Sequence, residues 1–235
     1  MKKIKAVIFD LDGVIVSTDE YHFQSWKQLA DAEGIPFDRE DNERLRGVSR
    51  MKSLEIILEK SAKVYSTAEK QTMAGRKNDI YQELLSRLSP SDVLPGVAST
   101  LQLLRERGMR VAIGSSSKNA VPILRAIGLA DVFDVVVDGN HISRSKPDPE
   151  VFTLAAQRLG VPREQCLVVE DADAGVEAAL AAGMNVLAVG SANGHPKATL
   201  SAENLAQITP DELLLTDVSQ AREPRVADAL RKAWF

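Results

Sequence analysis

The sequence predicts an α/β protein in which a doubly wound parallel sheet carries an inserted α-helical domain. Short apolar runs rich in β-branched residues alternate with helical patterns over most of the chain, as expected when helices cover both faces of a parallel sheet. After the first run, about seventy residues follow a helical pattern without a strand, which breaks this alternation. The 235 residues suffice for one large domain with such an insertion. We therefore expect a core domain from residues 1–15 and 92–235 and a helical domain from residues 16–91.

The first strand and the helical insertion follow from apolar runs, helical spacing and capping residues. We expect the strand at Ile4–Phe9, because its apolar run ends abruptly in acidic residues. A capping box from Ser66 to Glu69 predicts the start of a long helix, and we assign the apolar face of that helix to the core of the helical bundle. This face is formed by Ile80, Tyr81, Leu84, Leu85 and Leu88. The other helices of the insertion are expected from Thr18 or Asp19 to Gly34, from Asp38 to Gly47, and around Leu54, Ile57 and Leu58.

The alternation of helices and strands resumes at Leu94. Glycines are expected to end two of its helices, at Gly108 and Gly128, and each buried strand reads as a short apolar run. The expected strands are Met109–Gly114, Val135–Val137, Cys166–Val169 and Asn185–Val189, and the expected helices are Pro95–Gly108, Ala120–Ile127 and Glu150–Leu159. Beyond Gly190 the pattern is weaker, with a possible strand at Ala206–Ile208 and a final helix at Val226–Trp234.

Composition excludes several classes of protein. The net charge is −4 with lysines and arginines scattered along the chain, so no basic stripe suggests a nucleic-acid partner. No apolar stretch approaches the ~20 residues needed to span a membrane, and no signal-peptide pattern precedes the first strand. The single cysteine, Cys166, excludes an internal disulfide or a cysteine metal cluster and reads as a core residue. We expect a cytoplasmic protein, and a monomer.

Two carboxylates directly follow the first strand. Asp10 and Asp12 stand two residues apart at its carboxyl end, where ligands bind in open α/β sheets, and Gly13 permits a sharp turn after them. Side chains at i and i+2 of an extended backbone point the same way, so both carboxylates should face one spot and require a cation. With only oxygen ligands available, Mg²⁺ is the natural choice. The alternative is a polar turn that merely follows a strand.

Polar groups also follow other strands of the expected sheet. Ser115, Ser116 and Ser117 end the second strand, Lys146 precedes Pro147, and Glu170 and Asp171 end the fourth strand. Taken singly, these read as a loop, a solvated lysine and a helix cap. In one pocket they would supply a carboxylate nucleophile, a metal cage, a phosphate cradle and a balancing cation, which is the equipment for phosphoryl transfer through an aspartyl-phosphate.

These motifs resemble the four motifs of the haloacid dehalogenase superfamily over nearly the whole chain: FDLDGV, the serine at the second strand end, KPDP and EDADAG. The helical insertion resembles the small cap domain of that superfamily. Within it, the closest resemblance is to the β-phosphoglucomutase family, through TDEYHF at 18–23, GVSR at 47–50, RKND at 76–79 and the segment 115–119. One departure is Ser17, since many relatives have Asp-Thr where this chain has Ser-Thr, and a charge near the hinge is therefore missing.

The resemblance implies a role for each matching residue. Asp10 would be the nucleophile and Asp12 the general acid and base. Mg²⁺ would be held by the carboxylates of Asp10 and Asp171 and the backbone carbonyl of Asp12, with Glu170 beside them. Ser115, the amide of Ser116, and Lys146 would hold the transferring phosphoryl group. The residues expected to bind the rest of the substrate are Thr18, His22, Gly47, Val48, Arg50, Ser53, Lys77, Ser117 and Asn119.

The resemblance thus implies an intramolecular phosphotransferase that interconverts β-D-glucose 1-phosphate and glucose 6-phosphate. Glucose 1,6-bisphosphate would be the intermediate and the priming phosphodonor. Such an enzyme needs a second phosphate position, for which Arg50 is the candidate because a guanidinium grips phosphate with a fork of donors. The alternative reading of Arg50 is a solvated side chain at a helix start, and His22 could equally be a partly buried polar residue. The alternatives for the function are a sugar-phosphate phosphatase and, from another class, a phospho-acceptor signalling module.

Overall fold

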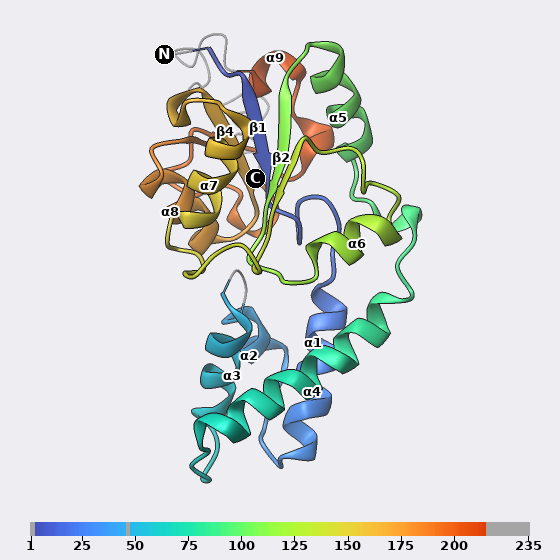
Figure 1. Cartoon of the computed structure of the whole chain (residues 1–235), viewed down its shortest axis with the longest axis vertical. Helices are drawn as coiled ribbons and strands as arrows, with labels where there is room; N and C mark the ends of the chain where they lie inside the picture. Colours follow the sequence, from blue (N-terminus) through green and yellow to red (C-terminus); the bar gives the residue numbers. More distant parts are fainter. Residues whose placement is uncertain (1–2, 46–47, 215–235) are drawn as a thin grey trace, which may run out of the picture.

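The computed structural model describes residues 3–45 and 48–214. Figure 1 shows two parts, an α/β core that contains the sheet and a smaller group of helices at one end of it. Among the described residues, no helix combines the length and the apolarity needed to cross a membrane.

The core is built on a parallel sheet of six strands in the order β3-β2-β1-β4-β5-β6. Phe9 at the end of β1 pairs with Ile113 on one side and Val169 on the other, so β1 lies at the centre with every neighbour in parallel register. This confirms the expected doubly wound sheet. The strands are β1 (Ala6–Phe9), β2 (Arg110–Gly114), β3 (Val135–Val137), β4 (Cys166–Glu170), β5 (Asn185–Ala188) and β6 (Leu200–Ser201).

Helices cover both faces of the sheet, and the side chains of β1 divide between them with the two-residue period of a strand. Val7 and Phe9 are buried in one apolar cluster, whereas Ala6 and Ile8 are buried in another. The first cluster includes residues of α5 (Val97–Glu106), α6 (Ala120–Ala126) and α9 (Pro210–Leu213). The second includes residues of α7 (Glu150–Leu159) and α8 (Asp173–Ala181), which lie on the other side of the strands in Figure 1.

The insertion between β1 and β2 consists of α1 (Asp19–Ala32), α2 (Arg39–Glu43), α3 (Arg50–Leu58) and α4 (Thr67–Leu85). It has its own apolar core around Trp26, Leu54 and Met73. The capping box at the start of α4 is present, because the Ser66 hydroxyl accepts from the Glu69 amide and the Glu69 carboxylate accepts from the Ser66 amide.

The prediction that the apolar face of α4 belongs to the core of the helical bundle is wrong, because none of its five residues lies in that core. Tyr81, Leu85 and, just beyond the helix, Leu88 are buried in the cluster that covers one face of the sheet. Met73 and Ala74, nearer the start of α4, are buried in the core of the insertion. The helix therefore joins the two parts, and its last turns are anchored to the α/β core.

The chain leaves and re-enters the core through two adjacent segments. Val16 forms an antiparallel bridge with Val93, and the Leu94 amide donates to the Ile15 carbonyl at 2.9 Å. These contacts hold the two connecting segments side by side at the base of the insertion.

One expectation beyond Gly190 is wrong. Ala206–Ile208 is not a strand, because Leu205–Gln207 forms a 3₁₀ turn in which the side chain of Asn204 accepts from the Ala206 amide at 2.9 Å. The sequence also missed β6, a two-residue edge strand. The helix expected at Val226–Trp234 lies outside the described residues.

Gly175 and Gly75 offer a test of packing at the carboxyl end of β4, since both are helix residues, Gly175 in the first turn of α8 and Gly75 in the interior of α4. A Cβ on Gly175 would lie 1.8 Å from Oε1 of the buried Glu170, whereas a Cβ on Gly75 would meet nothing within 4 Å. Gly175→Ala should lower the free energy of unfolding by about 1–3 kcal/mol through overpacking. Gly75→Ala should raise it by about 0.5–1 kcal/mol, because alanine favours the helix. Urea unfolding of both variants tests this, and a stabilised Gly175→Ala protein would contradict the packing described.

Candidate active site

The site lies where the strand order of the sheet reverses. The chain runs from β1 to β2 on one side and later returns to β4 on the other side, so a crevice forms at the carboxyl ends of β1 and β4. Asp10 follows β1, and its amide donates to the Val169 carbonyl of β4 at 2.9 Å. Glu170 and Asp171 end that neighbouring strand, so the topology alone brings their carboxylates to Asp10.

These three carboxylates form a compact, buried acidic group. Ligand oxygens of Asp10, Glu170 and Asp171 all lie within 4.8 Å of one another. Burial, and then the Glu170 and Asp10 charges, raise the pKa of Asp171 to about 9. Burial also raises the pKa of Glu170. Carboxylates held this close favour a proton or a cation, and a set of oxygen ligands suits a hard ion such as Mg²⁺.

Among the described residues, Lys146 is the lysine whose ammonium contacts this acidic group. Its ammonium donates to both Asp10 and Glu170 and is almost completely buried. Burial alone would lower the pKa of Lys146, but the two carboxylates outweigh it and raise the pKa above its ordinary value. The lysine therefore stays charged and offsets part of the acidic repulsion.

The carboxylate of Asp12 turns away from the acidic group toward the insertion. It accepts from the Thr18 amide at 2.7 Å and from the Thr18 hydroxyl at 2.6 Å. The expectation that Asp10 and Asp12 face one spot assumed that the extended strand continues to Asp12, but β1 ends at Phe9, before either residue. Burial, and then the charge of Asp19, raise the pKa of Asp12 to about 7. A carboxyl group with this pKa can both donate and accept a proton near neutral pH.

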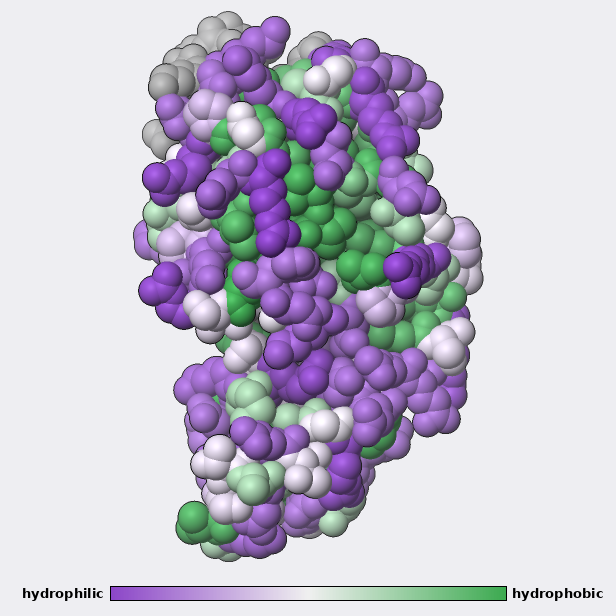
Figure 2. All heavy atoms as spheres, in the orientation of Figure 1, coloured by the Kyte–Doolittle hydropathy of each residue, from purple (hydrophilic) through white to green (hydrophobic). Residues whose placement is uncertain are grey.

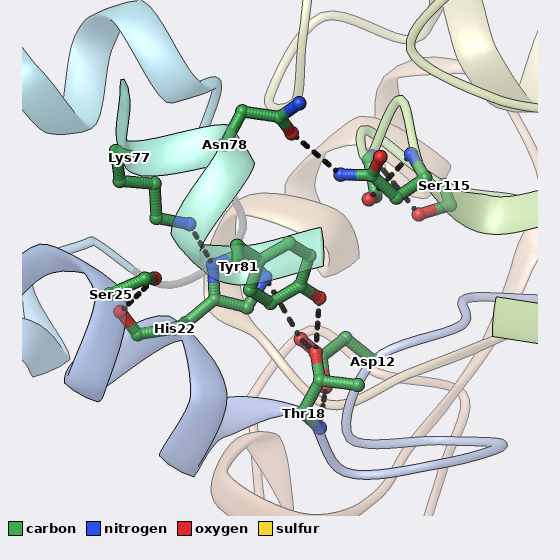
Figure 3. A network of polar contacts seen from close by, with 10 residues as sticks. Asp12, Thr18, His22, Ser25, Lys77, Asn78, Tyr81 and Ser115 are labelled. Carbon is green, nitrogen blue, oxygen red and sulfur yellow. Dashed lines mark hydrogen bonds and ion pairs between the residues drawn. The ribbon is translucent and has the colours of Figure 1, made fainter. Parts of the chain in front are cut away.

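Side chains of α1 and α4 extend this network into the insertion, as Figure 3 shows. The Tyr81 hydroxyl lies 2.8 Å from the Thr18 hydroxyl, and His22 Nε2 lies 3.6 Å from an Asp12 oxygen. His22 Nδ1 lies 3.0 Å from the Lys77 ammonium. Burial lowers the pKa of both His22 and Lys77 well below their ordinary values, and the positive charge of Arg50 adds to this effect in each case. Polar side chains of α1 and α4 therefore form a continuous set of contacts beside Asp12.

The loop after β2 forms the opposite wall. Ser115 is buried, its hydroxyl accepts from the Ser117 amide at 3.1 Å, and the Ser117 hydroxyl accepts from the Asn119 amide at 3.1 Å. The Ser116 hydroxyl is buried and has no hydrogen-bond partner among the described residues.

A cavity of about 610 Å³ lies between the core and the insertion and collects nearly all the predicted site residues. Figure 2 shows a notch in the surface between the two parts. Thr18 is not among the lining residues, because it lies behind Asp12, and Gly47 lies outside the described residues. The predicted residues that line the cavity are Asp10, Asp12, His22, Val48, Arg50, Ser53, Lys77, Ser115, Ser116, Ser117, Asn119, Lys146, Glu170 and Asp171.

Two polar residues of α4 were not predicted as part of the site. Tyr81 was assigned to an apolar face. Because a buried tyrosine hydroxyl usually has a hydrogen-bond partner, the residue type itself indicated a polar contact, and that partner is Thr18. Asn78 stands inside the RKND segment and hydrogen-bonds to both Arg50 and Asn119. The sequence places Asn78 on the same helix as Lys77 but gives no sign of these contacts.

Comparisons with known proteins agree with this geometry. The model of the haloacid dehalogenase-like hydrolase family matches residues 4–183, and the chain belongs to that family. Beta-phosphoglucomutase of Bacillus subtilis is 45% identical over 93% of this chain and 97% of its own length. The crystal structure of beta-phosphoglucomutase from Clostridium difficile covers 88% of this chain and 94% of its own, with a TM-score of 0.84 and 38% identity. A phosphorylated carbohydrates phosphatase of Thermotoga maritima is 32% identical over 90% of this chain and 97% of its own length.

The acidic group predicts a characteristic response to Mg²⁺. The folded-state pKa of Asp171, about 9, lies above its ordinary value of 3.8, so at pH 7 folding requires this carboxyl group to take up a proton, which costs stability. Without Mg²⁺, Asp171→Asn should therefore be at least as stable as the wild type. With Mg²⁺ at a hundred times its dissociation constant, the wild type should gain about 2.7 kcal/mol and Asp171→Asn far less.

Denaturant unfolding with and without Mg²⁺ measures this response, with Asp173→Asn as the matched control. Asp173 begins α8 two residues further on and is not part of the acidic group. Equal stabilisation of Asp171→Asn and the wild type by Mg²⁺ would place the metal site elsewhere.

Proposed function

We propose that the protein is an intramolecular phosphotransferase that interconverts β-D-glucose 1-phosphate and glucose 6-phosphate. The observation that carries the proposal is that one cavity is lined by Asp10 of the core and by Arg50 of the insertion. A mutase needs a nucleophile for one phosphate and a separate grip for the other, and these two residues suit the two tasks. The relatives named beta-phosphoglucomutase support the same reading.

In the proposed mechanism, glucose 1,6-bisphosphate first primes Asp10 as an aspartyl-phosphate. The 6-hydroxyl of β-D-glucose 1-phosphate then attacks this phosphorus atom, its proton passes to Asp12, and the bond from phosphorus to Asp10 breaks, which gives glucose 1,6-bisphosphate. The bisphosphate turns round in the cavity, and Asp10 attacks the phosphorus atom at the 1-position. The bond from that phosphorus to the sugar oxygen breaks, Asp12 returns its proton to the leaving oxygen, and glucose 6-phosphate is released.

The other residues position the phosphoryl group and the sugar. Ser115, the amide of Ser116, and Lys146 hold the transferring oxygens. Mg²⁺, when held by Asp10, Asp171, the Asp12 carbonyl and the neighbouring Glu170, supplies neutralising charge to the phosphoryl group.

The insertion, with proposed boundaries at residues 16–91, acts as a cap that excludes water from the aspartyl-phosphate. His22, Gly47, Val48, Ser53 and Lys77 contact the sugar from this side, and Thr18, which does not line the cavity, contributes by holding the Asp12 carboxylate. Ser117 and Asn119 help to orient the sugar phosphate from the core. We further propose a cytoplasmic monomer without nucleic-acid or membrane partners, consistent with the scattered charge of the chain.

The second candidate function is a sugar-phosphate phosphatase. The relative from Thermotoga maritima that is named a phosphatase of phosphorylated carbohydrates favours it. The two functions share the acidic group and differ in whether water or a sugar hydroxyl attacks the aspartyl-phosphate. A phospho-acceptor signalling module needs neither the cap nor Arg50.

Replacing Arg50 separates the two enzymes. Arg50→Ala should reduce isomerisation at low substrate at least about tenfold, which is the size of one lost hydrogen bond to a charged group. Hydrolysis of acetyl phosphate, which is too small to reach the cap, should change little. Arg50→Lys should recover only part of the loss, because an ammonium lacks the fork of donors.

The matched control is Arg44→Ala, which removes a cap arginine that pairs with Glu59 and does not line the cavity. Both reactions of this variant should run near wild-type rates. An equal slowing of both reactions in Arg50→Ala would contradict the mutase assignment and favour the phosphatase.

A further inference from the structure

The carboxamide of Asn78 contacts Arg50 and the core at the same time. Its Oδ1 accepts from Arg50 Nη2 at 2.7 Å and from Asn119 Nδ2 at 3.0 Å. Arg50 begins α3 of the insertion, whereas Asn119 precedes α6 of the core. Figure 3 shows Asn78 on α4 reaching across toward the loop that carries Ser115. One oxygen thus receives a donor from each part of the protein.

Asn119 fixes the orientation of the Asn78 side chain. Asn119 is 4% exposed, and its own Oδ1 accepts from Gln82 Nε2 at 3.1 Å. Its Nδ2 donates to the Asn78 oxygen, and the same oxygen accepts from Arg50 Nη2. The backbone amide of Asn119 donates in turn to the Ser117 hydroxyl at 3.1 Å. The side-chain amides of Asn78 and Asn119 therefore link the direction of the Arg50 side chain to the loop after β2.

The contact orients Arg50 without neutralising it. Among the described residues, no carboxylate forms an ion pair with Arg50, and the groups that oppose the effect of burial on its pKa are Tyr81 and then Asp79, both on α4. Burial lowers the pKa of Arg50 from its ordinary value of 12.5, so the guanidinium is partly desolvated yet keeps its charge. A single hydrogen bond to a neutral amide leaves the remaining donors of the fork available to an anion.

We propose that Asn78 is a positioning residue that aims Arg50 at the distal phosphate of the substrate. The inference rests on the proposed role of Arg50 as a phosphate grip. Asn78 acts through Arg50 and does not touch the reacting atoms. A neutral amide suits this task because a carboxylate at the same position would form an ion pair with Arg50 and compete with the phosphate.

The first test compares Asn78→Ala, Asn78→Asp and Gln82→Ala. Asn78→Ala should raise the KM for the sugar phosphate and the inhibition constant of inorganic phosphate about 5- to 10-fold, while kcat changes less. Asn78→Asp keeps the size of the side chain but should weaken phosphate binding more than Asn78→Ala does. Gln82→Ala removes the other α4 contact to Asn119 without touching Arg50, and both constants should stay within about twofold of the wild type.

A double-mutant cycle supplies the second test. In an Arg50→Ala background, adding Asn78→Ala should have no further effect on phosphate inhibition, because Asn78 has lost the group through which it acts. Additive losses would overturn the proposal, as would equal effects of Gln82→Ala and Asn78→Ala, which would point to docking of the cap alone. Tolerance of Asn78→Asp would overturn the argument from charge.

Phosphate inhibition keeps this outcome separate from that of the proposed function. If the wild type mainly releases inorganic phosphate from glucose 1-phosphate, the mutase assignment fails, but the cycle still measures whether Asn78 acts through Arg50. If isomerisation is confirmed and the cycle is additive, only the role of Asn78 fails.

Discussion

The structure depends on the interactions that hold three buried carboxylates together at the carboxyl ends of β1 and β4, where the strand order of the sheet reverses. Asp10, Glu170 and Asp171 come together because β1 and β4 are neighbours, and Lys146 contacts two of them from the segment before α7. Two glycines leave the space that the acidic group occupies. A Cβ on Gly13 would lie 2.0 Å from the Asp171 carboxylate, and a Cβ on Gly175 would overlap the Glu170 carboxylate. Such a group needs a cation, and this need links the fold to metal-assisted phosphoryl chemistry.

The insertion gives this chemistry a second wall. It leaves and re-enters the core through paired segments at Val16 and Val93, and the last turns of α4 pack on the core. Asp12 is held from the insertion side by Thr18, whose hydroxyl contacts Tyr81 of α4. The group proposed as acid and base is therefore positioned by the same elements that would close over a sugar phosphate, so that in the proposed mechanism proton transfer and exclusion of water depend on one arrangement.

Much of this arrangement could be predicted from the sequence, because buried parallel strands and capped helices leave strong local patterns. The helix boundaries at Ser66 and Gly108 and the strand at Val135–Val137 are confirmed. The errors arise where the local sequence pattern does not determine which surface or side chain a segment contacts. The apolar stripe of α4 indicated burial but not against which cluster. The weak strand pattern at Ala206–Ile208 did not reveal the 3₁₀ turn in which the Asn204 side chain accepts from the Ala206 amide. The contacts of Asn78 depend on side chains 28 and 41 residues away, which no local pattern encodes.

The central claim is that one cavity moves phosphate between two hydroxyls of a single sugar. The most direct measurement is ³¹P NMR of the wild-type protein with Mg²⁺, β-D-glucose 1-phosphate and a catalytic amount of glucose 1,6-bisphosphate. We expect the signal of glucose 6-phosphate to grow as the substrate signal falls, with inorganic phosphate appearing much more slowly. Conversion of the substrate mainly into inorganic phosphate, at the same rate with or without the bisphosphate, would contradict the account.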